Sequence, residues 1–255
     1  MYTNLYHCTV HKGASTFFRL LFNGYCPIVQ KYIKEYVCRH HEVDLKKQVG
    51  EPYHQQTNVT IPQNTIVHNV YCDYENFLKM PKSDNYRGIY VYRDPRELIV
   101  SFYYSWKLSH GKNHPRRAHL HEVSVKEGFM WTIDRLIDQD GIFNAMVDWV
   151  LNCQDPRFKL YKFENFFKDD ASQKKHLREV FNFFDIKISS GDLDVLNRQM
   201  VFKKLSKGRQ RGDTNIFKHY RSGIADSFRT ELPKECLNYF YKRTGNLIHT
   251  LGYED

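Results

Sequence analysis

The stretch Tyr6–Phe22, YHCTVHKGASTFFRLLF, passes from one pattern of secondary structure to another within a few residues. Leu5–Val10 alternates as a buried strand does, and Ser15–Asn23 has the apolar spacing of a helix that Gly24 would end. A lysine and two small residues lead into this helix, and its first two residues carry hydroxyls. Because the N-terminus of a helix offers unpaired N–H groups and a positive dipole end, this turn attracts anions. The sequence therefore predicts a phosphate-binding cradle at Lys12–Thr16.

The cradle does not follow the usual nucleoside-triphosphate rule. The fingerprint G-x-x-x-x-G-K-[ST] is absent from it. Lys12 adds a positive charge, Gly13 and Ala14 let an anion approach the backbone, and Ser15 and Thr16 offer hydroxyl donors. A plain turn in which Ser15 caps the helix would explain the same hydroxyls without any ligand.

The rest of the chain alternates between strand and helix patterns without repeats or low-complexity linkers. Ranges expected to form strands are Thr65–Val67, Gly88–Tyr92 and Phe158–Phe163, and those expected to form helices include Ile28–Val37, Leu98–Ser109, Phe143–Cys153, Leu177–Phe184 and Cys236–Thr244. This alternation predicts a single α/β domain over residues 1–255, with a central, mainly parallel sheet flanked by helices. Ligands of such sheets bind at the carboxyl ends of the strands.

Charge and cysteine content narrow the class of protein. The 255 residues carry a formal net charge of +9, and between Lys203 and Arg229 eight basic residues face two acidic ones. We call Lys203–Arg229 the basic segment. No apolar run reaches the roughly 20 residues of a membrane span, and no secretory signal pattern opens the sequence. The six cysteines are scattered, which favours reduced thiols and a cytoplasmic location.

A second motif lies in YVYRDPRELIVSFYYSW, Tyr90–Trp106. A strand is expected to end at Arg93, and Asp94 and Pro95 suit the first positions of a helix. Ser101 follows Arg93 by eight residues, about two helical turns. An arginine fork and a hydroxyl placed in this way can hold a phosphate together. A capped helix with a surface ion pair would explain the turn but not the serine among apolar neighbours.

The third motif is GRQRGDTNIFKHYRSGIADSF, Gly208–Phe228, at the heart of the basic segment. Glycines between arginines are typical of a mobile loop whose charges close over an anionic ligand. A solvated surface loop is the simpler alternative for a charge run taken by itself.

Taken in this order, the three motifs resemble those of sulfotransferases that use 3′-phosphoadenosine 5′-phosphosulfate (PAPS), particularly the soluble bacterial and cytosolic-type members. The Lys12–Phe17 run is similar to their 5′-phosphosulfate loop, K-x-G-[ST]-T-W. The Arg93–Ser101 run is similar to their 3′-phosphate motif, R-[ND]-P-[KR]-[DE]-x-x-x-S. Tyr220–Gly223, with Phe228 after it, is similar to their F-R-K-G-x-x-G-D-W element. The resemblance reaches from about residue 7 to about residue 229.

This resemblance implies a P-loop-like sulfotransferase fold, PAPS as co-substrate and adenosine 3′,5′-bisphosphate (PAP) as product, with no metal. Lys12 would contact the 5′-phosphate and the bridging oxygen and stabilise the leaving group. The nucleotide would be held by the residues that match the motifs and their usual companions: Lys12, Gly13, Ala14, Ser15, Thr16, Phe17, Arg93, Ser101, Phe163, Phe202, Arg221, Ser222 and Gly223. Phe17 would stack on the adenine where the family usually has Trp.

The chain departs from the family pattern in three places. Gly13-Ala14 stands where x-Gly is usual, and Phe163 lacks the hydroxyl of the usual Tyr. Ser222 replaces a basic residue near the expected 3′-phosphate, a loss for which Lys218, Arg209 or Arg211 would compensate.

The catalytic base is less sharply marked. In cytosolic-type members it is a His after the strand that precedes the R-D-P strand, and TIVHNVYCDYENF places His68 there. Its spacing from Arg93 is longer than expected, so the alternatives Tyr71, Asp73 and Glu75 stay open. A hydrogen-bonded structural histidine explains His68 equally well.

The remaining histidines do not predict a metal site. His110, His114, His119 and His121 match no zinc spacing, and Pro115–Arg117 reads as a loop that would line the acceptor site. The acceptor itself, a hydroxyl or amine on a small molecule or carbohydrate, does not follow from the sequence, nor does the oligomeric state.

Two other classes of protein compete with a sulfotransferase. A small-molecule P-loop kinase would need a Walker lysine and a magnesium-binding carboxylate, and neither is visible. A basic nucleic-acid-binding protein could use the basic segment and the many Tyr and Phe residues. The basic excess, however, falls where a nucleotide-phosphate motif is expected on independent grounds, so we expect no nucleic acid partner.

Overall fold

The computed structural model describes residues 2–40, 60–109 and 115–254. Five strands form one sheet in the order β2-β3-β1-β4-β5, and all neighbouring strands run parallel. The strands are β1 (Asn4–Thr9), β2 (Val37–His40), β3 (Thr65–Val70), β4 (Tyr86–Tyr92) and β5 (Phe158–Lys162). The expected α/β class with a central parallel sheet is therefore confirmed.

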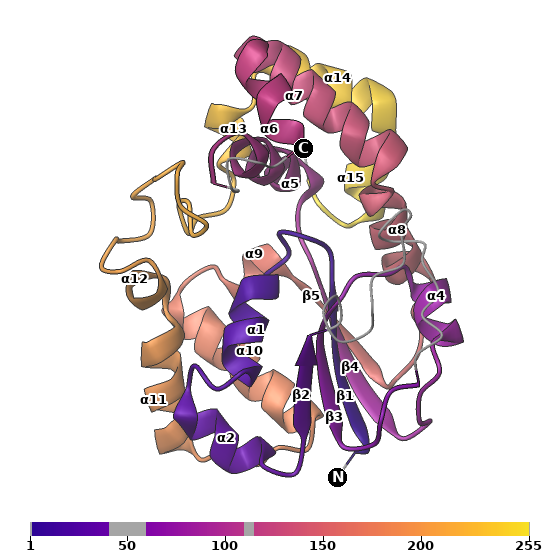
Figure 1. The fold of residues 1–255 in the computed structure, drawn as a ribbon, viewed down its shortest axis with the longest axis vertical. Coiled ribbons are helices and arrows are strands. Elements are labelled where there is room, and N and C mark those ends of the chain that lie inside the picture. The colour runs from indigo at the N-terminus through magenta and orange to yellow at the C-terminus, as the bar shows by residue number, and fades with distance from the viewer. Residues whose placement is uncertain (1, 41–59, 110–114, 255) are drawn as a thin grey trace.

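Helices cover both faces of the sheet (Figure 1). One face packs against α1 (Ser15–Phe22), α2 (Pro27–Ile33), α10 (Asp170–Phe183) and α11 (Ser190–Met200) in a single apolar cluster. The other face packs against α4 (Tyr74–Lys79) and α8 (Ile142–Asn152), with Trp149 fully buried. Burial of both faces explains why the central strands read as nearly continuous apolar runs.

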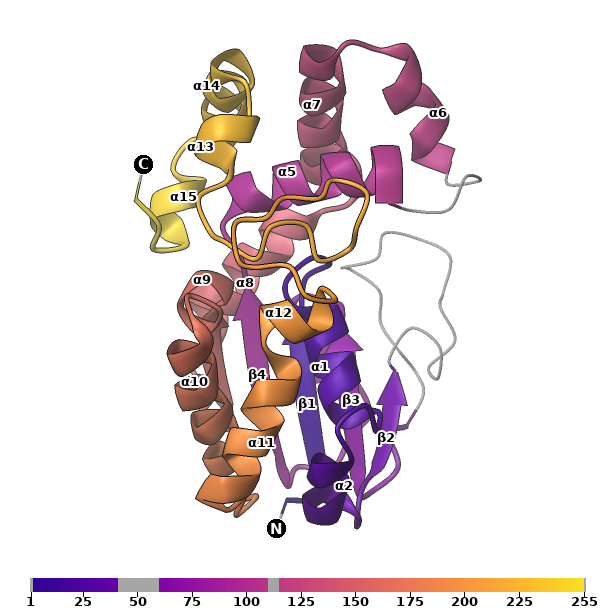
Figure 2. The same ribbon diagram turned by 90° about the vertical axis from the view of Figure 1, so that its left-hand side faces the viewer.

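A group of helices stands beyond the carboxyl edge of the sheet (Figure 1). The group contains α5 (Pro95–Tyr104), η1 (Ser105–Ser109), α6 (Pro115–Glu122), α7 (Val125–Asp134), η2 (Arg135–Gln139), α13 (Phe228–Glu231), α14 (Lys234–Thr244) and α15 (Leu247–Thr250). Two further short helices outside it are α9 (Phe163–Phe166) and α12 (Phe202–Leu205). Between α12 and α13, the basic segment crosses above the beginning of α1 (Figure 2). The carboxyl edge of the sheet, α5 and the basic segment therefore lie near one another.

Strand register brings two of the motifs together. Thr9 of β1 pairs with Val91 of β4, and Tyr92 of β4 pairs with Lys162 of β5. The loops that leave these three neighbouring strands therefore start at the same edge, as parallel topology requires.

Two expectations for local structure were wrong. The helix expected over Ile28–Val37 ends at Ile33, and Val37–His40 forms the edge strand β2 beside β3. Pairing with β3 overrides the helical pattern there, because the strand buries part of its surface that a continued helix would expose. The expected loop at Pro115–Arg117 is instead the start of α6, where Pro115 takes the first helical position.

Candidate functional site

One cavity opens where the carboxyl edge of the sheet meets the basic segment. Twelve of the residues expected to bind nucleotide line it: Lys12, Ala14, Ser15, Thr16, Phe17, Arg93, Ser101, Phe163, Phe202, Arg221, Ser222 and Gly223. They come from segments more than 200 residues apart in the sequence, since Thr16 and His219 are hydrogen-bonded across a separation of 203. Gly13 lies within the cradle without lining the cavity, and His68 does not line it.

Backbone geometry shapes the cradle. Lys12 and Ala14 both have positive φ, 69° and 75°, a backbone conformation that residues other than glycine rarely adopt. Ala14 occupies the N-cap position of α1 and offers no side chain to cap it. The plain turn capped by Ser15 is therefore not what forms, because Ser15 is already the first helical residue. The first amides of α1 point toward the cavity end of the helix, where the helix dipole favours an anion.

The backbone around Gly13 leaves no room for a side chain. A Cβ on Gly13 would lie 2.6 Å from Thr9 Oγ1, 3.0 Å from Val10 O and 3.1 Å from Val91 O. The Thr9 hydroxyl fills this position, at 2.6 Å from Gly13 O and 2.8 Å from Val91 O. The cradle is thus pressed directly onto the ends of β1 and β4.

Lys12 faces the cavity from the cradle and is held in a dry environment. Its Nζ donates to Ser105 Oγ at 2.5 Å, in η1. Burial, and secondly the nearby Arg93 guanidinium, lowers the pKa of Lys12 from 10.5 to about 8. An anion in the cavity would offset both effects, because it supplies the negative charge that this ammonium lacks.

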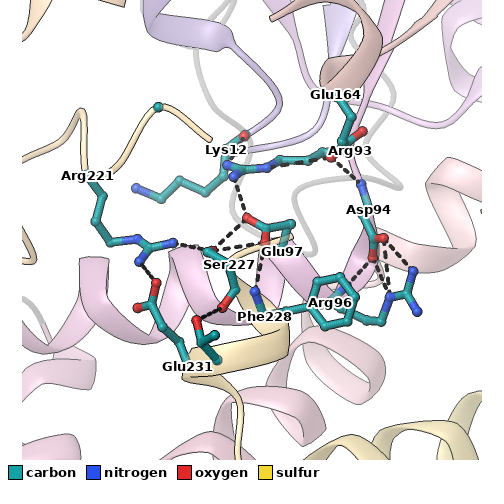
Figure 3. A network of polar contacts seen from close by, with 12 residues as sticks. Lys12, Arg93, Asp94, Arg96, Glu97, Glu164, Arg221, Ser227, Phe228 and Glu231 are labelled. Carbon is teal, nitrogen blue, oxygen red and sulfur yellow. Dashed lines mark hydrogen bonds and ion pairs between the residues drawn. The ribbon is translucent and has the colours of Figure 1, made fainter. Parts of the chain in front are cut away.

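Two arginines of the expected 3′-phosphate site share one buried carboxylate network (Figure 3). Arg93 donates to Glu97 Oε2 at 2.8 Å, and Glu97 is 1% exposed. Ser227 Oγ donates to Glu97 at 2.9 Å and accepts from Arg221 at 2.6 Å, while Arg221 also pairs with Glu231. Glu97 and Ser227 therefore lie between the two arginines and couple α5 to the end of the basic segment.

The Arg93 guanidinium is packed between an aromatic ring and a carboxylate. Its Cζ lies 4.4 Å from the centre of the Phe163 ring, and its Nε is buried without a hydrogen-bond partner within the described residues. The Glu164 carboxylate is 3.9 Å from Nε, and burial raises the pKa of Glu164 despite this arginine. These contacts hold Arg93 at the wall of the cavity that it lines.

Arg96 plays a structural part in the same motif. It is 2% exposed, pairs with Asp94 at 2.7 Å, and donates to Tyr241 and to the Glu254 carbonyl. Asp94 also caps α5 by accepting from the Arg96 amide. Arg96 and Asp94 therefore fix the start of α5 rather than face the cavity.

Arginine side chains also build the basic segment. Arg209 donates to the carbonyls of Asp213, Arg221 and Tyr220. Arg211 donates to Phe167 O and Gly223 O and pairs with Asp170. Of the three residues considered as compensation for Ser222, Arg211 lines the cavity, whereas Arg209 and Lys218 do not.

Gly223 and His219 bring the basic segment onto the rest of the site. Gly223 has φ 70°, and a Cβ there would lie 2.4 Å from the Phe202 ring. His219 Nε2 lies 2.7 Å from Thr16 Oγ1. The segment is therefore in direct contact with the cradle.

His68 lies away from the cavity. It is fully buried on β3, and its Nε2 lies 3.1 Å from Asn23 Oδ1, at the C-terminal end of α1. The cradle is at the other end of this helix, about 12 Å away at ~1.5 Å per residue. Burial, then the neighbouring His40 and Arg19, lowers the pKa of His68 to about 3. The geometry gives no support to the expectation that His68 is the base.

The alternatives to His68 occupy different environments. Asp73 caps α4 by accepting from the Asn76 amide at 2.7 Å, and Glu75 is a surface residue paired with Lys79. Tyr71 is 7% exposed and stacks on His11, with ring centroids 3.9 Å apart. Since His11 directly precedes Lys12, Tyr71 is the alternative that the fold places next to the cradle; like His68, neither His11 nor Tyr71 lines the cavity.

The histidine-rich stretch has structural partners where it is described. His119 packs on Trp131 and His121 lies 2.9 Å from the Lys107 carbonyl, whereas His110 and His114 lie outside the described residues. Among residues 2–40, 60–109 and 115–254, no group of His, Cys, Asp or Glu side chains is arranged to hold a metal ion. None of the helices in these ranges is long and apolar enough to cross a membrane.

Sequence reasoning missed several residues of the site. Glu97 was part of the quoted R-D-P-R-E motif, and its acidic type was the available signal for a partner of Arg93. Arg211 was named only as one of three residues that would compensate for Ser222, and His219 was not singled out. Gln173 and Phe167, which also line the cavity, carried no signal because their roles depend on tertiary packing.

Comparison with known proteins agrees with this geometry. The family model of the sulfotransferase domain matches residues 8–252. Among solved structures, mouse sulfotransferase SULT7A1 complexed with PAP superposes with a TM-score of 0.64 at 13% identity, covering 98% of this chain and 88% of that one. Retinol dehydratase in a complex with retinol and PAP gives 0.61 at 14% identity, covering 99% and 83%. No curated protein matches the sequence.

The family match extends over nearly the whole chain, and the similar structures share its fold across almost their full length. This chain belongs to the sulfotransferase family.

Proposed function

We propose that this sulfotransferase moves the sulfuryl group of PAPS to a hydroxyl or amine of a small-molecule or carbohydrate acceptor. One observation carries the proposal: the cradle, the Arg93–Ser101 motif and the basic segment all line a single cavity. Two anion-binding sites joined by an apolar, aromatic-lined space suit a nucleotide with phosphates at both ends. The PAP bound in the similar structures supports the same ligand.

In this proposal, different residues bind the two phosphate ends and the adenine of the nucleotide. The cradle, with Lys12, binds the 5′-phosphosulfate. Arg93 and Ser101 bind the 3′-phosphate, and Arg221, Ser222 and Gly223 close over it. Phe17, Phe163 and Phe202 enclose the adenine. The acceptor oxygen or nitrogen attacks sulfur as the bond from sulfur to the bridging oxygen breaks. Lys12 stabilises the negative charge that grows on this oxygen, which favours the transition state over the ground state.

For the base that takes the acceptor proton, we propose the stacked pair His11 and Tyr71 in place of His68. An imidazole is the commonest general base, and His11 is the residue next to Lys12. Replacing His11 with Ala should lower turnover by about 10²–10⁴-fold with PAP affinity retained. The matched variant His68→Ala should keep its turnover and lose thermal stability instead. The opposite pattern would return the role to His68.

The class of acceptor, a small molecule or carbohydrate with a hydroxyl or amine, is part of this proposal. Retinol and androsterone occupy the similar retinol dehydratase structures, and both carry hydroxyl groups on apolar skeletons. The six free thiols, five of them buried, fit the reducing, cytoplasmic location expected from the sequence.

The test is transfer from PAPS, without added metal, to a panel of phenols, alcohols, amines and sugars, with PAP release measured. The expected result is a sulfated product from at least one acceptor, formed about 10²–10³-fold more slowly by Lys12→Ala. Phosphoryl transfer from ATP with magnesium and no reaction with PAPS would overturn the proposal.

A further inference from the structure

A buried glutamine is among the residues that line the cavity. Gln173, on α10, is 1% exposed, and the same cavity is lined by the apolar side chains of Phe167, Met200, Phe202 and Leu205. A polar side chain in such surroundings is costly unless its hydrogen bonds are made. Hydrogen-bond partners are therefore expected for both its amide nitrogen and its amide oxygen.

Neighbouring groups fix which way the Gln173 amide points. Asn197 Nδ2 donates to the Asp170 carbonyl at 2.9 Å, so Asn197 Oδ1 is left as an acceptor. Gln173 Nε2 donates to that oxygen at 3.0 Å. Because a backbone carbonyl can only accept, neither amide can be turned round without losing a hydrogen bond. The Asp170–Asn197–Gln173 relay thus holds Gln173 Oε1 as the outward end.

Gln173 Oε1 opens onto the cavity. Within the described residues no donor pairs with Gln173 Oε1. Other unpaired side-chain atoms are sealed from solvent, but this oxygen retains some exposure. Its remaining exposure therefore faces the cavity that Gln173 lines. An acceptor fixed in this way selects a ligand that brings a hydrogen-bond donor.

We propose that Gln173 determines base specificity, by accepting a hydrogen bond from the 6-amino group of the nucleotide's adenine. This inference rests on the proposed function, in which the cradle and Arg93 bind the phosphates and aromatic side chains of the same cavity enclose the adenine. Phe167 and Phe202 offer flat faces on which a purine stacks. Hypoxanthine and guanine carry an oxygen at position 6, which would set two acceptors against each other in a dry site.

The experiment compares adenosine 3′,5′-bisphosphate with inosine 3′,5′-bisphosphate by calorimetric titration. The wild type should bind the adenosine compound at least about tenfold more tightly. Gln173→Met keeps the size and removes the acceptor, and it should bring the two affinities within about twofold by weakening the adenosine compound. Gln199→Met, on α11 at a position that does not line the cavity, is the matched control and should keep the preference.

A second variant tests the relay itself. Asn197→Leu leaves Gln173 in place but frees its amide to rotate, so the preference should fall while the inosine compound binds as well or better. A glutamine that only joins α10 to α11 would not change the ratio of the two affinities, and an unchanged ratio in both variants overturns the inference. Equal binding of the two compounds by the wild type also overturns it but leaves the proposed function standing. Binding of neither compound overturns the proposed function and this inference with it.

Discussion

The cradle and the basic segment both face one cavity, but they are built in opposite ways. The cradle is a backbone structure: Gly13 N donates to Val10 O at 3.0 Å, and the Thr9 hydroxyl ties Gly13 O to Val91 O. The basic segment, which has no strand between α12 and α13, is held by arginine side chains that donate to its own carbonyls. Its end is fixed by Ser227, which donates to Glu97 from 130 positions away in the sequence.

This difference separates local from long-range encoding. A strand, a tight turn and a helix within a few residues specify the cradle, so its chemistry is fixed as soon as the sheet forms. The basic segment depends on partners in α5, α9 and α10, so its charges are positioned only in the complete fold. We expect substitutions in the cradle to change turnover and folding, and those in the basic segment to change nucleotide affinity.

The largest expected effect belongs to Lys12. Lys12→Ala should lower the rate of sulfuryl transfer by about 10²–10³-fold, because it removes a group that stabilises charge formed in the transition state. PAP affinity should fall much less. Arg221→Ala should show the reverse, weak PAP binding with turnover largely retained at saturating PAPS. Steady-state kinetics with separate PAP titrations distinguish the two, and identical profiles would break the comparison.

Arg93→Ala should have the next largest effect, on binding. A charge-assisted contact with a phosphate contributes roughly 1.5–3 kcal/mol, so PAP affinity should fall about 10–150-fold. The buried Glu97 also loses a partner, which should lower the melting temperature. Arg243→Ala removes an arginine paired with Asp134 and Asp138 outside the cavity, and it should leave PAP affinity unchanged.

Gly13→Ala tests the backbone side of the comparison. The added methyl would meet two carbonyl oxygens and the Thr9 hydroxyl, so the free energy of unfolding should fall by about 1–3 kcal/mol. Gly191→Ala, at a helical position with open space around it, should raise the free energy of unfolding by roughly 0.5–1 kcal/mol. Urea denaturation of both variants measures the difference. A Gly13→Ala protein as stable as the wild type would show that the cradle yields easily.

The pH dependence of binding should be the smallest of these effects. Because the pKa of Lys12 is lowered to about 8 in the unliganded protein, PAP should bind most tightly below pH 8. Above pH 8 the ammonium loses its proton, and affinity should fall by at most about tenfold per pH unit. Stability shows the opposite sign: between pH 8 and 10.5 the unfolded chain holds a proton that folded Lys12 has lost, so this residue's contribution rises with pH. Lys12→Arg should flatten both profiles, as followed by calorimetry and thermal denaturation.

Local patterns were enough to predict much of the fold. The strand-turn-helix at Leu5–Asn23 and the Asp94-Pro95 start of α5 were predicted because their signals lie within a few residues. The edge strand β2 and the helix α6 were missed because their conformations depend on β3 and on packing against η1. Long-range pairing decides such segments, and no single-sequence pattern records it.

The candidate site follows the same division. Lys12 and Arg93 could be singled out because each follows a strand in a recognisable motif. The network that joins Arg93 to Arg221 through Glu97 and Ser227 could not, because it connects positions 130 residues apart. The place of His68 in the sequence resembles that of the family base, but its Nε2 lies 3.1 Å from Asn23 Oδ1, at the end of α1 away from the cradle.

The central claim is that the cradle and the arginine network hold the two ends of one ligand, and calorimetric titration of PAP against adenosine 5′-monophosphate tests it most directly. The two compounds differ only in the 3′-phosphate. The account predicts that the wild type, in chelator and without metal, binds PAP at least about tenfold more tightly, and that Arg93→Ala loses this preference while keeping its affinity for the monophosphate. Equal affinity of the wild type for both compounds would contradict the account.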